Sequence, residues 1–207
     1  PIPIICELLG APKEDWKLFS RLATDVLRIF GSDLATELPT IMAAQEELDH
    51  YTRGLIAERR SVPLDDLLTD LISAEEAGDK LSNEELVMMV EAVIVGGTDT
   101  TRNQLGLALA LFAEHPDQWE LLRNDPSLAP RAVEEVMRYN GAVGGTIRFA
   151  SEDIEYNGVL FPKGTFMSTS MATGNFDASV FPEPNTFNIL RPPVGQPHLS
   201  LGAGIHY

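Results

Sequence analysis

The sequence has 207 residues, of which 44% are hydrophobic and 22% are charged, a composition typical of globular proteins. Fifteen basic and 31 acidic residues give a formal net charge of −16, which disfavours binding to nucleic acid or to an anionic membrane surface. The apolar runs are too short to span a bilayer, and the single cysteine, Cys6, excludes an internal disulfide and suits a reducing cytoplasm.

The spacing of apolar residues predicts helices through the first part of the chain. A first helix ends near Gly31, a second covers 32–60, and a short amphipathic helix over 63–77 stops at Gly78. Two further short helices, over 116–123 and 130–139, each have a proline near the start.

The longest predicted helix lies between these two groups. Ser82 and Glu85 form a capping-box pattern at its start, and His115-Pro116 ends it after Glu114. The segment 86–95 is apolar on every face, so we expect it to be buried all round. About 30 residues at 1.5 Å each make this helix roughly 45 Å long.

The period changes after residue 145. Short strands are predicted over 146–150, 154–156, 159–160 and 165–170, with turns at 157–158 and 163–164. From Phe181 onward the chain is rich in Pro, Asn and Gly and is expected to be ordered coil. The predicted fold is therefore mainly α, a long central helix with a small β region and a coil.

Two adjacent glycines, Gly96 and Gly97, interrupt the long helix and precede Asp99 and Thr100. Glycine inside a helix costs roughly 1 kcal/mol relative to alanine, so either a flat ligand against bare backbone or close packing of another helix should compensate. A carboxylate in this apolar segment needs water or a partner. A threonine here can bond the carbonyl group four residues back and open the helix.

Glu135 and Arg138 are three residues apart on one predicted helix. Taken alone, such a pair is most often an ordinary surface ion pair worth about 0.2–0.5 kcal/mol. Arg191 follows in the coil, and Leu201, Gly202, Gly204 and His206 mark a glycine-rich segment at the end of the chain.

These motifs, in this order, resemble those of the cytochrome P450 family of haem-thiolate monooxygenases. Residues 96–101 are similar to the family's distal-helix motif, and residues 135–138 to its E-x-x-R motif. Residues 201–206 resemble its haem loop, F-G-x-G-x-H-x-C, with Leu201 in place of phenylalanine. A further departure is Phe176, where the family often has arginine between Asn and Asp.

The resemblance implies a role for each marked residue. Asp99 would relay protons and Thr100 would hydrogen-bond the iron–oxygen unit, while Glu135, Arg138 and Arg191 would form a buried structural triad. The residues implied at the haem are Gly96, Gly97, Arg148, Leu201, Gly202, Gly204 and His206, with Arg148 and His206 on the propionates. The residues implied in the substrate pocket are Ala92, Val93, Val95, Val143, Gly144, Gly145 and Thr146.

The resemblance also implies how the whole protein works. Residues 1–207 would be part of a single cytochrome P450 domain, incomplete at both ends, that binds haem b and inserts one atom of dioxygen into a small apolar substrate. Electrons would come from NAD(P)H through a flavoprotein and a ferredoxin-type protein in the cytoplasm.

The iron's ligand is a cysteine expected immediately after Tyr207, so no metal ligand lies in this chain, and the chain as given is expected to be inactive. The alternative is a non-catalytic helical binding module, or a pseudogene product, that keeps the scaffold without haem. A cysteine codon after Tyr207 would favour the enzyme, and a stop codon the alternative.

Overall fold

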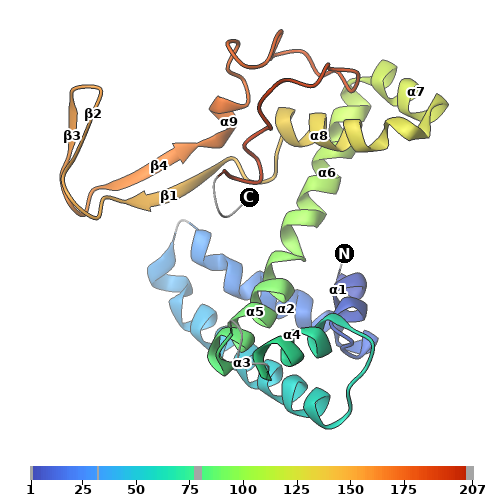
Figure 1. Cartoon of the computed structure of the whole chain (residues 1–207), viewed down its shortest axis with the longest axis vertical. Helices are drawn as coiled ribbons and strands as arrows, with labels where there is room; N and C mark the ends of the chain where they lie inside the picture. The colour runs from blue at the N-terminus through green and yellow to red at the C-terminus, as the bar shows by residue number, and fades with distance from the viewer. Residues whose placement is uncertain (1, 32, 77–80, 204–207) are drawn as a thin grey trace. The chain divides into compact units, whose positions relative to one another are not determined.

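The computed structural model describes residues 2–31, 33–76 and 81–203. The chain divides into two compact units, 1–102 and 103–207, and the boundary lies inside helix α6 (Asp99–Glu114). Figure 1 shows the elements of both units, which are mainly helical, as predicted.

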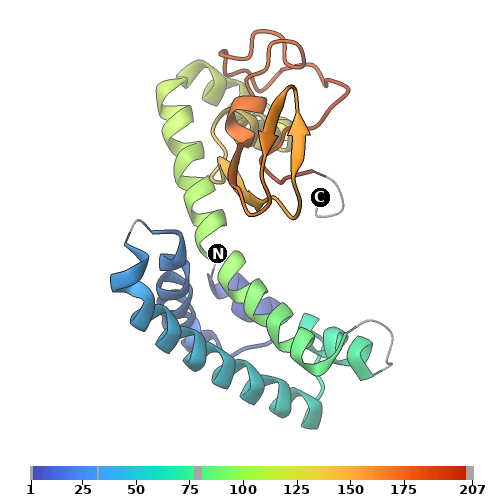
Figure 2. The same ribbon diagram turned by 90° about the vertical axis from the view of Figure 1, so that its left-hand side faces the viewer.

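The first unit is a cluster of helices. Its elements are α1 (Ile2–Leu8), α2 (Trp16–Leu27), α3 (Leu34–Ser61), α4 (Leu67–Glu76) and α5 (Asn83–Gly96). Helix α3 contacts α2, α4 and α5, and Figure 2 shows it running alongside α5. Their shared core includes Phe19, Leu22, Leu48, Leu86 and Val90. The predicted stop at Gly78 lies outside the described residues.

The predicted single long helix is wrong, because α5 ends at Gly96 and α6 begins at Asp99. Two threonine hydroxyls bond carbonyl groups at the break: Thr98 Oγ1 donates to Val95 at 2.9 Å, and Thr100 Oγ1 donates to Gly96 at 2.6 Å. Hydroxyl groups that bond the preceding turn locally open a helix. The sequence-based expectation for the Thr100 side chain is therefore confirmed.

The start of α5 agrees with its prediction, but its burial does not. Ser82 Oγ accepts a hydrogen bond from the Glu85 amide, and the Glu85 carboxylate accepts one from the Ser82 amide, which completes the capping box. Met88 and Met89, however, are 58% and 43% exposed. Helix α5 packs on α2, α3 and α4 with one face, so its apolar residues are not buried all round.

The second unit combines helices with two antiparallel strand pairs. Its helices after α6 are α7 (Pro116–Asn124), α8 (Ala129–Tyr139) and α9 (Met171–Gly174). Its strands are β1 (Gly145–Phe149), β2 (Ile154–Tyr156), β3 (Val159–Phe161) and β4 (Phe166–Ser170). Strand β1 pairs with β4, and β2 pairs with β3 (Figure 1).

The predicted turns and coil are confirmed. Asn157 and Gly158 have φ values of 50° and 76°, as a tight two-residue hairpin turn requires. The described coil after Phe181 contributes Phe187 and Ile189 to the core formed by Leu111 and Val136. Among the described residues, no helix has both the length and the hydropathy needed to cross a membrane.

A buried ion pair ties three segments of the first unit together. Arg59 Nε on α3 lies 3.1 Å from Asp66 Oδ2, and both side chains are almost fully buried. Arg59 Nη2 donates to the Gly10 carbonyl group at 2.7 Å, and Asp66 Oδ1 accepts from the Thr69 amide at 2.8 Å. The pair therefore fixes the turn after α1 and the start of α4.

We expect Gly10→Ala to destabilise the protein by at least about 1–2 kcal/mol, because Gly10 has a φ of 64°. A Cβ atom there would also lie 1.9 Å from Asp66 Oδ2 and 2.7 Å from Arg59 Nη2. The matched control is Gly54→Ala inside α3, where a Cβ atom meets nothing within 4 Å and alanine should stabilise by about 0.5–1 kcal/mol. Denaturant unfolding measures both variants, and equal midpoints would contradict the role of Gly10.

Candidate functional site

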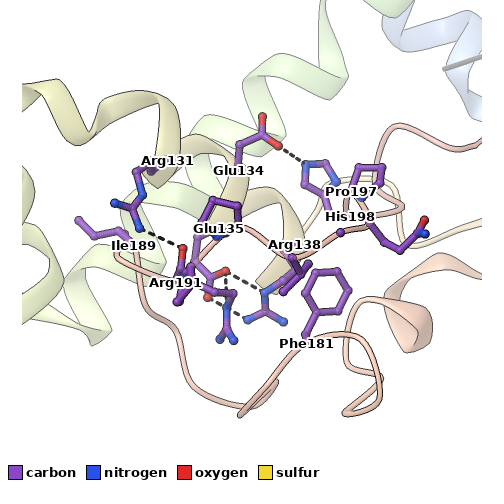
Figure 3. Close-up of a pocket in the computed structure, with 14 residues that line it drawn as sticks. Arg131, Glu134, Glu135, Arg138, Phe181, Ile189, Arg191, Pro197 and His198 are labelled. Carbon is purple, nitrogen blue, oxygen red and sulfur yellow. Dashed lines mark hydrogen bonds and ion pairs between the residues drawn. The ribbon is translucent and has the colours of Figure 1, made fainter.

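A buried carboxylate is the centre of the second unit. Glu135 accepts a bidentate pair of hydrogen bonds from Arg138, at 2.8 and 2.9 Å, and a third from Arg191 Nε at 3.0 Å (Figure 3). The amide of Asn188 donates a fourth at 3.0 Å. Glu135 and Arg138 are only 4% and 3% exposed, so the surface-pair alternative does not hold.

Both arginines also hold the coil by its carbonyl groups. Arg138 Nη1 donates to Asn175 and Pro184, and Arg191 donates to Pro182, Glu183 and Thr186. Each guanidinium group therefore uses its remaining donors on backbone oxygens.

Phe176, the departure from the family's Asn-Arg-Asp pattern, lies against this network. Its ring centroid is 5.5 Å from the Arg138 guanidinium carbon, and the Phe181 ring lies at the same distance. Aromatic faces at this distance stabilise a cation that has been removed from water. Phe176 therefore packs against the triad where an arginine would have added a third positive charge.

The ionisation of Glu135 follows from these contacts. Burial by itself raises the pKa of this carboxyl group, but the bonds from Arg138, Arg191 and the Asn188 amide outweigh it and hold the pKa below its ordinary value. Because the folded-state pKa is the lower one, ionised Glu135 stabilises the fold above the unfolded-state pKa. This contribution is lost as the pH falls through the folded-state value.

A second network, which no sequence motif indicated, joins the triad to the segment that leads into the glycine-rich loop. Asn175 is buried, and its Oδ1 accepts from the Leu199 amide at 2.7 Å. Its Nδ2 donates to Ser200 Oγ at 2.9 Å, and Ser200 Oγ donates to the Met137 carbonyl group at 2.6 Å. The Asn175 side-chain amide thus bonds this segment through both its oxygen and its nitrogen, and Ser200 in turn bonds the segment to α8.

His198 makes a second contact between the same segment and α8. Its Nδ1 accepts from the Ser200 amide at 3.2 Å, and its Nε2 lies 3.3 Å from Glu134 Oε2 (Figure 3). Burial lowers the pKa of His198, against the opposing effect of the Glu134 carboxylate. No sequence pattern around His198 predicts its contact with Glu134.

The two glycines of the helix break differ in their surroundings. A Cβ atom on Gly97 would lie 2.5 Å from Ile5 Cδ1 of α1 and 2.8 Å from the Val93 carbonyl oxygen. A Cβ atom on Gly96 would meet nothing within 4 Å. Close helix packing therefore explains Gly97, while the open backbone at Gly96 is compatible with an approaching ligand.

The pair after the break, Asp99 and Thr100, differs in exposure. Thr100 is exposed, and Asp99 is partly buried, with its Oδ1 2.5 Å from Arg102 Nη2. The carboxylate has the partner that its setting requires.

Part of the predicted haem-loop set lies within the described residues. Gly202 has a φ of 84°, which favours glycine, and Leu201 is exposed. Arg148 on β1 is also exposed, and its Nη1 donates to Thr146 Oγ1 at 2.7 Å. Gly204, His206 and Tyr207 lie outside the described residues.

The predicted pocket residues come from both units. On α5, Ala92 is exposed, while Val93 and Val95 are half-buried against the core of the first unit. In the second unit, 143–146 runs from the loop after α8 into β1, with residues 143 and 144 exposed.

Comparison with known proteins identifies the family. The family model described as Cytochrome P450 matches residues 13–196. Over 208 residues the chain is 36% identical to a steroid C26-monooxygenase of Mycobacterium tuberculosis, covering 100% of the chain and 55% of that relative. It is 38% identical over 209 residues to a vitamin D(3) 25-hydroxylase of Pseudonocardia autotrophica, covering 100% of the chain and 50% of the relative.

A solved structure agrees with these matches. The chain superposes on Mycobacterium smegmatis CYP164A2 with econazole bound at a TM-score of 0.89 and 32% identity, covering 100% of this chain and 53% of that one. The chain therefore belongs to the cytochrome P450 family, and its fold is that of the matching part of these enzymes. It spans about half the length of the relatives it matches.

We expect Glu135→Ala in the full-length protein to cost about 3–5 kcal/mol of unfolding free energy, because it leaves two buried arginines without their carboxylate. Haem content should fall with stability, and Glu135→Gln should be intermediate. Denaturant unfolding and the haem-to-protein absorbance ratio measure the effect.

The control is Glu120→Ala, which removes the acid of a second Glu-x-x-Arg pair. Glu120 and Arg123 on α7 lie 2.6 Å apart but are 54% and 61% exposed, so this change should cost less than about 1 kcal/mol. If both substitutions cost the same, the burial of the Glu135 network does not contribute to stability.

Proposed function

We propose that this chain is part of a haem-dependent monooxygenase that inserts one atom of dioxygen into an apolar organic substrate. The observation that carries the proposal is the opened turn between α5 and α6. There, a Cβ atom on Gly96 would meet nothing within 4 Å, and the Gly96 carbonyl group accepts a hydrogen bond from Thr100, which directly follows Asp99. In this proposal both units belong to a single cytochrome P450 domain.

The described residues fit a flat cofactor that carries carboxylates. The exposed guanidinium group of Arg148 suits a propionate, and the left-handed Gly202 lets the backbone turn close to a planar ring. In the proposal, Leu201 and Gly204 complete this loop and His206 binds the second propionate. Haem with a thiolate ligand supplies the activation of dioxygen.

The proposed roles of Asp99 and Thr100 follow from their hydrogen-bonding capacity. Thr100 Oγ1 donates its hydrogen to Gly96, so its oxygen lone pairs are available to accept a proton donor such as water. Asp99 keeps one carboxylate oxygen on Arg102, and its other oxygen is a second hydrogen-bond acceptor. Together they would pass protons along the opened turn.

The relatives indicate the class of substrate. One is named as acting on a steroid and the other on vitamin D(3), both apolar molecules. We propose that Ala92, Val93 and Val95, with 143–146, line an apolar pocket in this protein too. Electrons would come from NAD(P)H through a flavoprotein and a ferredoxin-type protein.

The test of the proposal is haem incorporation and turnover by the full-length protein. A folded protein that takes up haem and, with its electron donors, forms a hydroxylated product from a steroid or fatty acid supports it. A folded full-length protein that leaves haem in solution would support the non-catalytic binding module instead.

We expect Thr100→Ala to uncouple turnover, because it removes the hydroxyl group that positions a proton donor. The fraction of NAD(P)H that ends in product should fall severalfold, with a matching rise in hydrogen peroxide. Thr100→Ser should retain most of the coupling, and Thr101→Ala, at the neighbouring exposed threonine, should resemble the parent. Unchanged coupling in Thr100→Ala would remove the proton-delivery role.

Cys6 is the single cysteine of the 207 residues, and it is fully buried in α1. Burial raises the pKa of its thiol, and the Asp15 charge adds to this, so the thiolate needed by iron is disfavoured. Haem added to the 207-residue polypeptide should therefore give a reduced carbon monoxide complex without the red-shifted Soret band of a thiolate ligand. Observing that band, and losing it in Cys6→Ser, would overturn this expectation.

A further inference from the structure

One side chain of α6 both donates a hydrogen bond to the loop that follows α8 and accepts one from it. Gln104 Nε2 donates to the Asn140 carbonyl group at 3.1 Å, and Gln104 Oε1 accepts from the Ala142 amide at 2.8 Å. The side-chain amide thus pairs with one donor and one acceptor of the same short loop, as a neighbouring β-strand would. Gln104 is half-buried, so these bonds are partly shielded from water.

The rest of this loop is anchored at its two ends and packed in the middle. The Asn140 amide donates to Val136 on α8 at 2.8 Å, and the Ala172 amide donates to the Gly144 carbonyl group at 2.9 Å. Gly141 leaves no room for a side chain, because a Cβ atom would lie 2.5 Å from Ser200 Oγ. The bonds from Gln104 are therefore the contacts that fix the loop from the side of α6.

Val143 lies directly between these anchors and is 42% exposed. Its side-chain position depends on the backbone at Ala142, which Gln104 holds, and at Gly144, which α9 holds. Gln104 also lies four residues after Thr100 on the same helix. One amide thus connects the helix of the proposed proton-delivery residues to the proposed pocket loop.

We propose that Gln104 is a positioning residue that sets the shape of the substrate pocket by holding residues 140–143 against α6. This inference rests on the proposed function, which makes 143–146 a wall of that pocket. Gln104 itself touches no reacting atom. Its loss should change which ligands fit more than it changes haem binding.

The variants separate the two hydrogen bonds. Gln104→Leu is similar in size and removes both. Gln104→Glu keeps the acceptor for the Ala142 amide and places a carboxylate oxygen opposite the Asn140 carbonyl group. The control is Gln118→Leu, which removes an equally half-buried amide that accepts from the Ile189 amide at 3.0 Å, in the coil before Arg191.

The first measurement is hydrogen exchange of the full-length protein, read by fragmentation mass spectrometry at 140–146. Exchange at Ala142 should be roughly tenfold faster in Gln104→Leu, and near the parent rate in Gln104→Glu and Gln118→Leu. Parent-like protection in Gln104→Leu would overturn the proposal whether or not the protein binds haem.

The second measurement compares two probes of different size in the haem-loaded protein. Imidazole binds through its ring nitrogen, while econazole adds apolar rings that need the pocket wall. In Gln104→Leu the econazole Kd should rise by at least about threefold relative to the imidazole Kd, and this ratio should not change in Gln118→Leu. A parallel change in both Kd values, or an equal ratio change in the control, would show a merely structural role.

The two proposals can fail separately. If the parent protein shows no spectral change with either probe, the haem function fails and the pocket role fails with it. If the parent binds both probes and Gln104→Leu keeps their Kd ratio, only the role of Gln104 fails. If Gln104→Leu does not fold, Gln104→Glu still decides: a slow-exchanging Ala142 amide supports the acceptor bond, and a fast one contradicts it.

Discussion

The buried Glu135 carboxylate is the interaction on which the second unit depends. It accepts four hydrogen bonds from two arginines and one backbone amide, on the face of α8 that also buries Ala132 and Val136. A charge removed from water in this way is tolerated only when it is paired and fully hydrogen-bonded. The coil after Phe181 has no helix or strand of its own among its described residues, so these polar contacts give it a defined path.

The polar network extends from this carboxylate in two directions. Arg138 bonds the Asn175 carbonyl group, and the Asn175 side chain bonds the segment that leads into the glycine-rich loop. Ser200 in that segment lies beside Gly141. Gln104 bonds the two residues on either side of Gly141, which are Asn140 and Ala142. A change at one end, such as loss of a guanidinium group, therefore affects the loop and the proposed pocket wall together.

At the break between α5 and α6, the adjacent glycines Gly96 and Gly97 have different surroundings. Gly97 is small because Ile5 of another helix occupies the space beside it, whereas the space beside Gly96 is open. The same turn satisfies its carbonyl groups with threonine hydroxyls in place of regular helical bonds. The carbonyl groups of Val95 and Gly96 therefore find their partners within the turn itself.

The sequence by itself determined the family, the helical first part, the short strands with their turns and the order of the motifs, because these depend on local periodicity, capping and turn chemistry. Ser82 with Glu85, and Asn157 with Gly158, act within four residues and were predictable for that reason. Tertiary structure alone decided the rest. Glu120–Arg123 and Glu135–Arg138 are the same pattern, yet only the second is buried, because the coil bearing Arg191 folds over it. The contacts of Asn175, His198 and Gln104 likewise join residues that are 24 to 64 positions apart in the sequence. Only packing brings these residues together, so no local sequence pattern encodes their contacts.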